Sequence, residues 1–234
     1  MDVQVGVAKV AKYAVSESGD TVELIERPNG GVSAVLVDGQ RSGRSAKIIS
    51  NIVARKAISL LGEGVRDGAA ARAAHDYLCT HRRGQVSAEL QIISVDLASR
   101  TLVISRNTHC AAYVVQGGVC RVLDAPANAI GLYPNTKPVI EEIALLPGTV
   151  AVVSSDGVAA AGSRRGESLN LVPLLAEILA SERNAQQIAD AILARALALD
   201  EGRPVDDTSV VVVSVLDNAV EEPRVRRLSA TFPL

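Results

Sequence analysis

The sequence predicts an α+β domain in which antiparallel sheets are layered with pairs of helices. Strand-like segments dominate the chain, and most are joined by polar turns too short for parallel crossover connections. The helical segments come in two consecutive pairs instead of alternating with strands. The order of strands, two helices, many strands, two helices and a last strand favours a layered α+β fold over a Rossmann-like alternation.

The N-terminal part of the chain is expected to form three strands and then two helices. Valines alternate with other residues at the start, and PNGG (28–31) is a turn signal between two apolar runs. Apolar residues then recur at the three-and-four spacing of a helical face, and Gly62 and Gly84 are typical helix stops. We expect strands around 3–7, 21–27 and 31–38, and helices over 43–61 and 67–83.

The remaining elements follow from the same patterns. Three runs joined by short polar turns, 86–97, 101–107 and 110–116, predict a meander. Further strands are expected at 118–123, 139–145, 149–155 and 208–216, and helices at 171–181 and 185–199. With no internal repeat and no low-complexity linker, residues 1–234 are predicted to form one domain, with 218–234 a tail or an edge strand.

Composition excludes several classes of function. The 234 residues are 48% apolar and 21% charged, which is ordinary for a globular protein. Lys plus Arg is 24 and Asp plus Glu is 26, and aromatic residues make up only 2%, so neither nucleic acid nor a membrane is expected as a partner. No signal peptide, long apolar run or disulfide framework is visible, which predicts a cytoplasmic protein.

Aspartates stand where several of the predicted strands begin or end. If PNGG is a four-residue hairpin loop, Arg27 pairs with Val32 and Thr21 lies opposite Asp38, so that Asp20 is a neighbour of Asp38 at the open end. Each aspartate alone could be a turn residue or a helix cap, and Asp38 could cap the helix that follows it.

Two further acidic segments point to the same end of a sheet. Asp156 follows the strand at 149–155, and Asp206 and Asp207 precede the strand at 208–216. If these strands are antiparallel neighbours, their aspartates meet. Clustered carboxylates repel one another unless a cation neutralises them, and all-oxygen ligands suit magnesium or manganese.

The acidic segments resemble motifs of a known family. SGD (18–20), VDGQRSGRSA (37–46), SSDGV (154–158) and VDDTSVVVV (205–213) are similar, in order and spacing, to those of metal-dependent serine/threonine phosphatases of the protein phosphatase 2C superfamily. The small bacterial SpoIIE-type branch is the best match. The resemblance implies a four-layer α-β-β-α sandwich of two antiparallel sheets flanked by helix pairs.

The resemblance also implies a site and a reaction. The ligands of two divalent cations, Mn or Mg, would be Asp20, Asp38, the backbone carbonyl of Gly39, Asp156 and Asp206, with Asp38 bridging the ions and Asp20 and Asp38 catalytic. Asp207 is the weaker candidate of its pair. The implied activity is hydrolysis of phosphoserine or phosphothreonine by a metal-activated water. A phosphorylated STAS-type anti-anti-sigma regulator is the implied partner and substrate.

One departure from the family pattern keeps other functions open. The family commonly has a D-G-x-G-x-G turn, and here Arg41 replaces the first of the two further glycines while Gly43 remains. Arg41 could bind a substrate phosphate through its guanidinium. The alternatives are a non-catalytic regulatory or partner-binding domain of the same fold, and a hydrolase acting on a small phosphoester.

Overall fold

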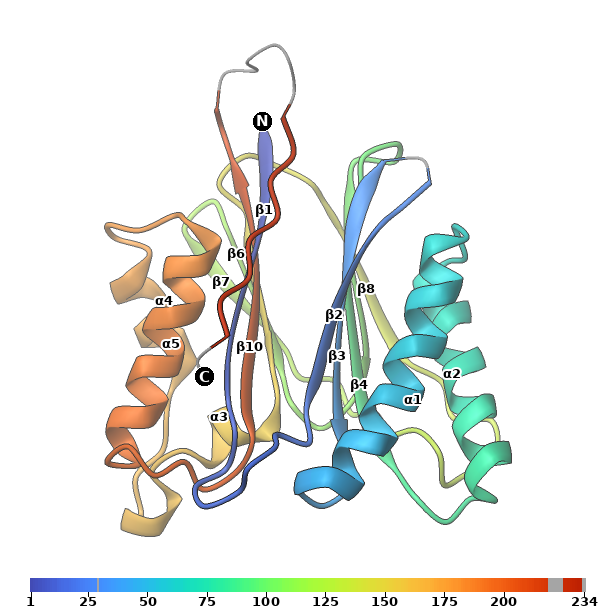
Figure 1. Ribbon diagram of the computed structural model, residues 1–234. Coiled ribbons are helices and arrows are strands. Elements are labelled where there is room, and N and C mark those ends of the chain that lie inside the picture. Colours follow the sequence, from blue (N-terminus) through green and yellow to red (C-terminus); the bar gives the residue numbers. More distant parts are fainter. Residues whose placement is uncertain (29, 219–224, 233–234) are drawn as a thin grey trace.

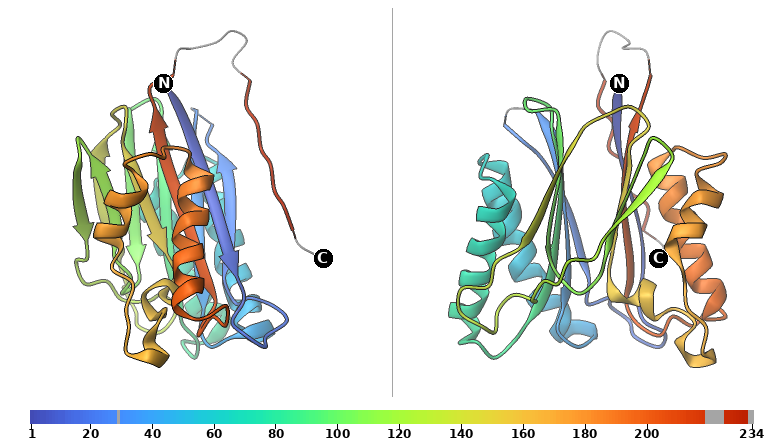
Figure 2. Two further views of the ribbon diagram at one scale, coloured as in Figure 1. Left: turned by 90° about the vertical axis from the view of Figure 1, so that its left-hand side faces the viewer. Right: turned by 180° about the vertical axis from the view of Figure 1, so that it is seen from behind.

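Four layers make up the protein, seen edge-on in the computed structural model of Figure 1. The structure describes residues 1–28, 30–218 and 225–232. Two five-stranded antiparallel sheets pack face to face, and a helical pair covers the outer face of each, as the second view of Figure 2 also shows. The predicted α+β sandwich is therefore confirmed.

Each sheet joins strands that are far apart in the sequence. The first sheet has the order β1-β10-β9-β6-β7, and the second has the order β2-β3-β4-β5-β8. The strands of the first sheet are β1 (Asp2–Val10), β10 (Thr208–Leu216), β9 (Val150–Ser154), β6 (Ala112–Gln116) and β7 (Val119–Leu123). Those of the second are β2 (Thr21–Glu26), β3 (Gly31–Gly39), β4 (Ala88–Asp96), β5 (Thr101–Asn107) and β8 (Val139–Ala144).

The helices form two outer layers. Helices α1 (Gly43–Gly62) and α2 (Asp67–Arg82) cover the second sheet, and α4 (Leu171–Ile178) and α5 (Ala185–Leu199) cover the first. The fourth predicted helix, 185–199, is confirmed, and Asn184 caps it by accepting from the backbone N–H groups of Gln186 and Gln187. Two short elements were not predicted, namely α3 (Asp156–Ala160) and the 3₁₀ turn η1 (Ser163–Arg165).

Strand β10 shows how the sequence builds these layers. Its first eight residues are buried, because both faces of its sheet are covered. Val211, Val213 and Val215 point into the core between the sheets. Val210 and Val212 point the other way, into the core under α4 and α5. The near-continuous valine run is what a strand buried on both faces requires.

The β2–β3 hairpin differs from its predicted register by one residue. Glu26, not Arg27, pairs with Val32, and Thr21 pairs with Val37 instead of Asp38. The hairpin closes one step further on, where the Arg27 backbone N–H donates to the Gly31 oxygen at 3.1 Å, and both Gly30 and Gly31 adopt positive φ, +85° and +106°. Asn29, in the predicted turn, lies outside the described residues. The consequence is that Asp20 directly precedes, and Asp38 directly follows, the last pair of the hairpin.

The predicted meander over 86–116 is wrong in its last step. Strands β4 and β5 pair, but β6 lies in the other sheet. The buried Arg106 holds the crossing by donating to the backbone oxygens of Cys110 and Ala125, at 3.0 and 2.9 Å. Short loops can thus join two packed sheets as well as two paired strands.

The C-terminal segment is only partly described. Residues 225–232 are exposed and form no strand, while 219–224 and 233–234 lie outside the described residues. Among the helices described, none is long and apolar enough to span a bilayer.

Candidate metal centre

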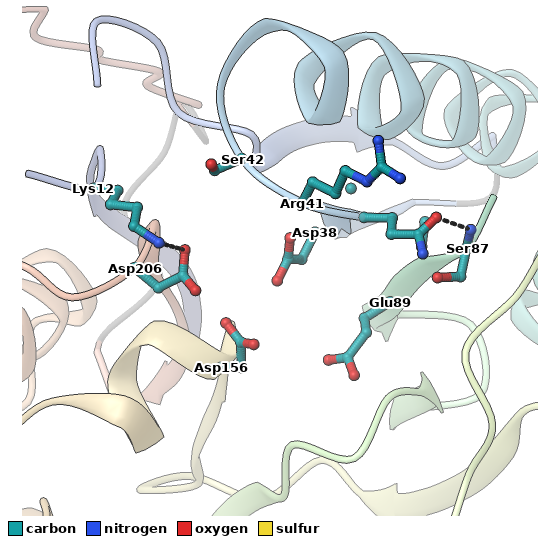
Figure 3. A pocket seen from close by; sticks show the side chains of 11 residues that line it. Lys12, Asp38, Arg41, Ser42, Ser87, Glu89, Asp156 and Asp206 are labelled. Atoms are coloured by element: carbon teal, nitrogen blue, oxygen red, sulfur yellow. Dashed lines mark hydrogen bonds and ion pairs between the residues drawn. The ribbon is translucent and has the colours of Figure 1, made fainter. Parts of the chain in front are cut away.

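An acidic pocket of about 300 Å³ lies at the end of the sandwich where β3 and β9 finish and β10 begins (Figure 3). It collects residues from five segments that are remote in sequence. Its lining residues are Lys12, Asp38, Gly39, Gln40, Arg41, Ser42, Ser87, Ala88, Glu89, Asp156 and Asp206. The pairing of β9 with β10 is the antiparallel neighbourhood that the sequence argument required.

Asp38 is placed by the tight junction of β3 with α1. A Cβ added to Gly39 would lie 2.1 Å from the backbone oxygen of Ala46, so only glycine allows the first turn of the helix to press against the strand end. The residue at the helix N-cap is Ser42, not Asp38. The capping role considered for Asp38 is therefore wrong, and its carboxylate points into the pocket.

Asp156 and Asp206 approach Asp38 from the other sheet. Asp156 is the first residue of α3, directly after β9 and its N-cap Ser155. Gly157 makes this approach possible, since a Cβ there would lie 2.2 Å from the backbone oxygen of Asp207. Figure 3 shows the carboxylates of Asp156 and Asp206 directed toward the same space as that of Asp38.

The two acids at 206 and 207 have different surroundings. Asp207 is buried, and its carboxylate accepts from the backbone N–H groups of Lys12 and Gly19, both at 2.9 Å. Asp206 faces the pocket, where the ammonium group of Lys12 lies 3.7 Å from its Oδ1. Asp207 therefore holds loops together, and Asp206 is the acid available to a ligand.

Asp20 lies behind the pocket and is fully buried. Its Oδ2 accepts from the Ser209 hydroxyl at 2.6 Å, and its Oδ1 has no hydrogen-bond partner among the described residues. Its backbone oxygen accepts from the ammonium groups of Lys9 and Lys47 at 2.8 and 2.7 Å. These bonds fix the Asp20 backbone, while one carboxylate oxygen is left unsatisfied at a cost.

Burial and mutual repulsion raise the pKa values of three carboxyl groups at this site, which favours their protonated forms. Burial, and then the negative charges of Asp20 and Asp156, raise the pKa of Asp38 from 3.8 to about 9. Burial, followed by the charge of Asp206, raises the pKa of Asp156 to about 6. Burial also raises the pKa of Asp20 to about 6, although the Ser209 hydroxyl opposes the rise. Repulsion of this kind is relieved by bound cations.

Arg41 lies at the pocket, as its place in the sequence suggested, but its guanidinium is not among the carboxylates. Figure 3 shows the side chain running from the pocket toward α1. Its φ is +77°, a left-handed conformation that costs an ordinary residue energy and that the family's glycine adopts freely. Arg41 is exposed, and in the described part of the chain it makes no ion pair.

Two charged residues of the pocket, Lys12 and Glu89, were not predicted from the sequence. Lys12 precedes the acidic motifs, and its backbone N–H bond to Asp207, with the neighbouring bond from the Tyr13 N–H to the Pro204 oxygen, holds it at the site. Glu89 lies on β4 as the cross-strand partner of Asp38. The pairing of two predicted strands was the signal that could have found Glu89, but the sequence alone did not supply the register.

These residues fit a divalent-cation centre. Among the described residues, no group of three or more His, Cys, Asp or Glu side chains is already arranged to hold a metal ion. The orphaned Asp20 Oδ1 and the mutually repelling acids are nevertheless the donor set that a hard cation with oxygen ligands would satisfy. Four of the five expected ligand residues line one pocket, and the fifth, Asp20, lies behind it.

The fold and this site together define a protein of the protein phosphatase 2C-like class. The chain belongs to the SpoIIE family: the family model for stage II sporulation protein E matches residues 28–216. It is 22% identical over 216 residues to stage II sporulation protein E of Bacillus subtilis, with 92% of the chain covered but only 26% of that relative. The chain thus spans about a quarter of the curated relative's length.

Solved structures agree on the fold. A structure of the phosphatase domain and a regulatory fragment of SpoIIE from Bacillus subtilis matches with a TM-score of 0.79 at 21% identity, covering 94% of this chain and 64% of that one. The catalytic domain of the serine/threonine phosphatase PstP, in complex with two manganese ions, matches with a TM-score of 0.69 at 16% identity, covering 92% and 99%.

Proposed function

We propose that this domain hydrolyses phosphoserine or phosphothreonine on a protein substrate and that it requires two divalent cations, Mn or Mg. The observation that carries the proposal is the convergence of Asp38, Asp156 and Asp206 on one pocket, with Asp20 behind it, in a chain that belongs to the SpoIIE family. That PstP, which shares the fold, is a phosphatase structure with two manganese ions supports the choice of cofactor.

The residues that would hold the cations are Asp20, Asp38, the Gly39 carbonyl, Asp156 and Asp206. When bound, the cations supply the charge that makes water acidic enough to attack phosphorus at neutral pH and that stabilises the phosphoryl oxygens. Asp38 is central to this set because it lies among the other acids and carries the largest upward shift in pKa. Asp20 is held rigid by Ser209 and by the two lysines on its backbone oxygen.

Two positively charged side chains at the pocket would bind the phosphate group of the substrate. Lys12 and Arg41 are the positively charged residues that line it. Arg41 would swing its guanidinium over the pocket and donate two hydrogen bonds to a phosphoryl oxygen pair. Lys12 would leave Asp206, with which it makes only a half-exposed ion pair, and contact the phosphate.

A phosphorylated STAS-type regulator is the proposed physiological substrate, by resemblance to SpoIIE-type enzymes. The pocket is open and polar, which suits a phosphorylated side chain presented by a folded partner better than a small molecule that must be enclosed. The curated relative is a much longer protein than this chain.

The proposal is tested by p-nitrophenyl phosphate hydrolysis with manganese, magnesium or EDTA, and by release of phosphate from a phosphorylated STAS protein. We expect release with manganese, and its loss in Asp38→Asn and in EDTA. A folded domain without manganese-stimulated release of phosphate from either substrate would instead support a non-catalytic regulatory domain.

A further inference from the structure

We propose that Glu89 is a further ligand of the cations in this pocket, so that the second sheet contributes an acid from β4 as well as from β3. This inference rests on the proposed function, because it concerns the same cations. It adds a residue that lies outside all four acidic motifs of the chain.

The position of Glu89 is set by strand pairing. Asp38 and Glu89 are direct partners in the antiparallel β3–β4 ladder, which places both residues at the same end of the second sheet. Like charges directly opposite one another destabilise a sheet. Both residues line the pocket, and Figure 3 shows the Glu89 carboxylate extending from β4 toward the side of the pocket where Asp156 lies.

The neighbours of Glu89 orient it without neutralising it. The buried Thr108 hydroxyl donates to Oε2, and the Cys110 thiol lies 3.7 Å from the same oxygen. Both neighbours are uncharged. In the described part of the chain, no lysine or arginine forms an ion pair with Glu89.

A structural role alone does not explain this arrangement. A glutamate that served only strand stability would be expected opposite a cation or facing open solvent. Glu89 instead lies opposite Asp38, and its negative charge raises the pKa values of Asp38 and Asp156. One oxygen is held by Thr108, and the other has no hydrogen bond to a described residue although Glu89 is only partly exposed. A carboxylate of this kind is ready to bind a hard cation directly or through a water.

The test is titration of the metal-free protein with Mn²⁺, followed by calorimetry and by the paramagnetic resonance of free Mn²⁺. The variants are Glu89→Gln, Asp38→Asn and the control Glu142→Gln, which removes an equal charge from an exposed position on β8 of the same sheet. We expect Glu89→Gln to weaken Mn²⁺ binding about 10-fold or more. Glu142→Gln should bind Mn²⁺ like the wild type.

Melting in EDTA separates ligation from folding. Because Glu89→Gln removes a repulsion with the ionised Asp156, its metal-free melting temperature should equal or exceed that of the wild type, while the rise produced by Mn²⁺ should shrink. Unchanged Mn²⁺ affinity in Glu89→Gln, with binding lost in Asp38→Asn, would overturn this inference and leave the proposed function intact. A fall in melting temperature of equal size with EDTA and with Mn²⁺ would also overturn it. A wild type that binds no Mn²⁺ would overturn the proposed function and this inference together.

Discussion

Asp206 and Asp207 are adjacent in sequence but serve two different structures: Asp206 faces the pocket beside Lys12, and Asp207 is buried under two backbone N–H donors. We expect Asp206→Asn to weaken Mn²⁺ binding about 10-fold or more, with little change in stability. Asp207→Asn turns an acceptor toward Lys12 or Gly19 into a donor, and should lower the free energy of unfolding by about 1–3 kcal/mol. Calorimetric titration and urea unfolding measure the two effects. Equal losses of affinity and of stability in the two variants would contradict this division.

Metal-free stability should depend on pH through Asp38. Its pKa is raised from 3.8 to about 9 in the folded protein, so the folded state binds this proton more tightly than the unfolded state does. The resulting stabilisation is complete below about pH 4 and is lost as pH rises through about 9. We expect the free energy of unfolding in EDTA, taken as wild type minus Asp38→Asn, to fall over this window.

Manganese should reverse that dependence, because the ligands bind the cation only after they lose their protons. Stabilisation of the wild type by Mn²⁺ should therefore grow from pH 5 to pH 8, as measured by urea unfolding.

For the metal-free protein, parallel pH profiles for wild type and Asp38→Asn in EDTA would show that Asp38 does not carry the raised pKa.

Substitution of Gly157 by alanine tests the close contact between α3 and the start of β10. Its φ is ordinary, so alanine in this helix would by itself stabilise the protein by about 0.4–1 kcal/mol. The added Cβ would instead lie 2.2 Å from the Asp207 oxygen and 2.6 Å from the Thr208 hydroxyl. We expect Gly157→Ala to lose about 1–3 kcal/mol of stability and to bind Mn²⁺ more weakly, since Asp156 is displaced. A rise in melting temperature would show that the contact is looser than described.

Arg41→Gly should have opposite effects on stability and activity. Glycine relieves the left-handed conformation at φ +77°, which stabilises the fold by about 1 kcal/mol. Loss of a charge-assisted contact with phosphate should lower kcat/KM for a phosphopeptide about 10-fold. Arg41→Lys, which keeps the charge without the bidentate fork, should retain part of the activity. Unchanged or improved turnover in Arg41→Gly would exclude a role in substrate binding.

Much of the fold could be predicted from local patterns, and the failures are informative. The continuous valine run predicts β10 because a strand covered on both faces buries every residue. The three-and-four spacing of apolar residues predicts α1 because such residues share one face of a helix. The hairpin register failed by one residue, since it depends on how Gly30 and Gly31 turn rather than on hydrophobic pattern. The crossing after β5 depends on the buried bonds of Arg106, which no short window of sequence reveals.

The site likewise contains residues that short motifs predicted and residues that they did not. Asp38, Asp156 and Asp206 could be grouped because each lies at a strand end within a recognisable short motif, and the structure brings them to one pocket. Glu89 and Lys12 belong to no such motif. Their places follow from the β3–β4 pairing and from the Asp207 bond to the Lys12 backbone, which are long-range features.

The central claim is that acids from remote segments form one divalent-cation centre. The most direct measurement is the anomalous diffraction of manganese in crystals of the metal-loaded domain. We expect peaks within coordination distance of Asp38 and of Asp156 or Asp206, absent from crystals of Asp38→Asn. A fully manganese-loaded wild-type crystal with no anomalous peak in this pocket would contradict the account.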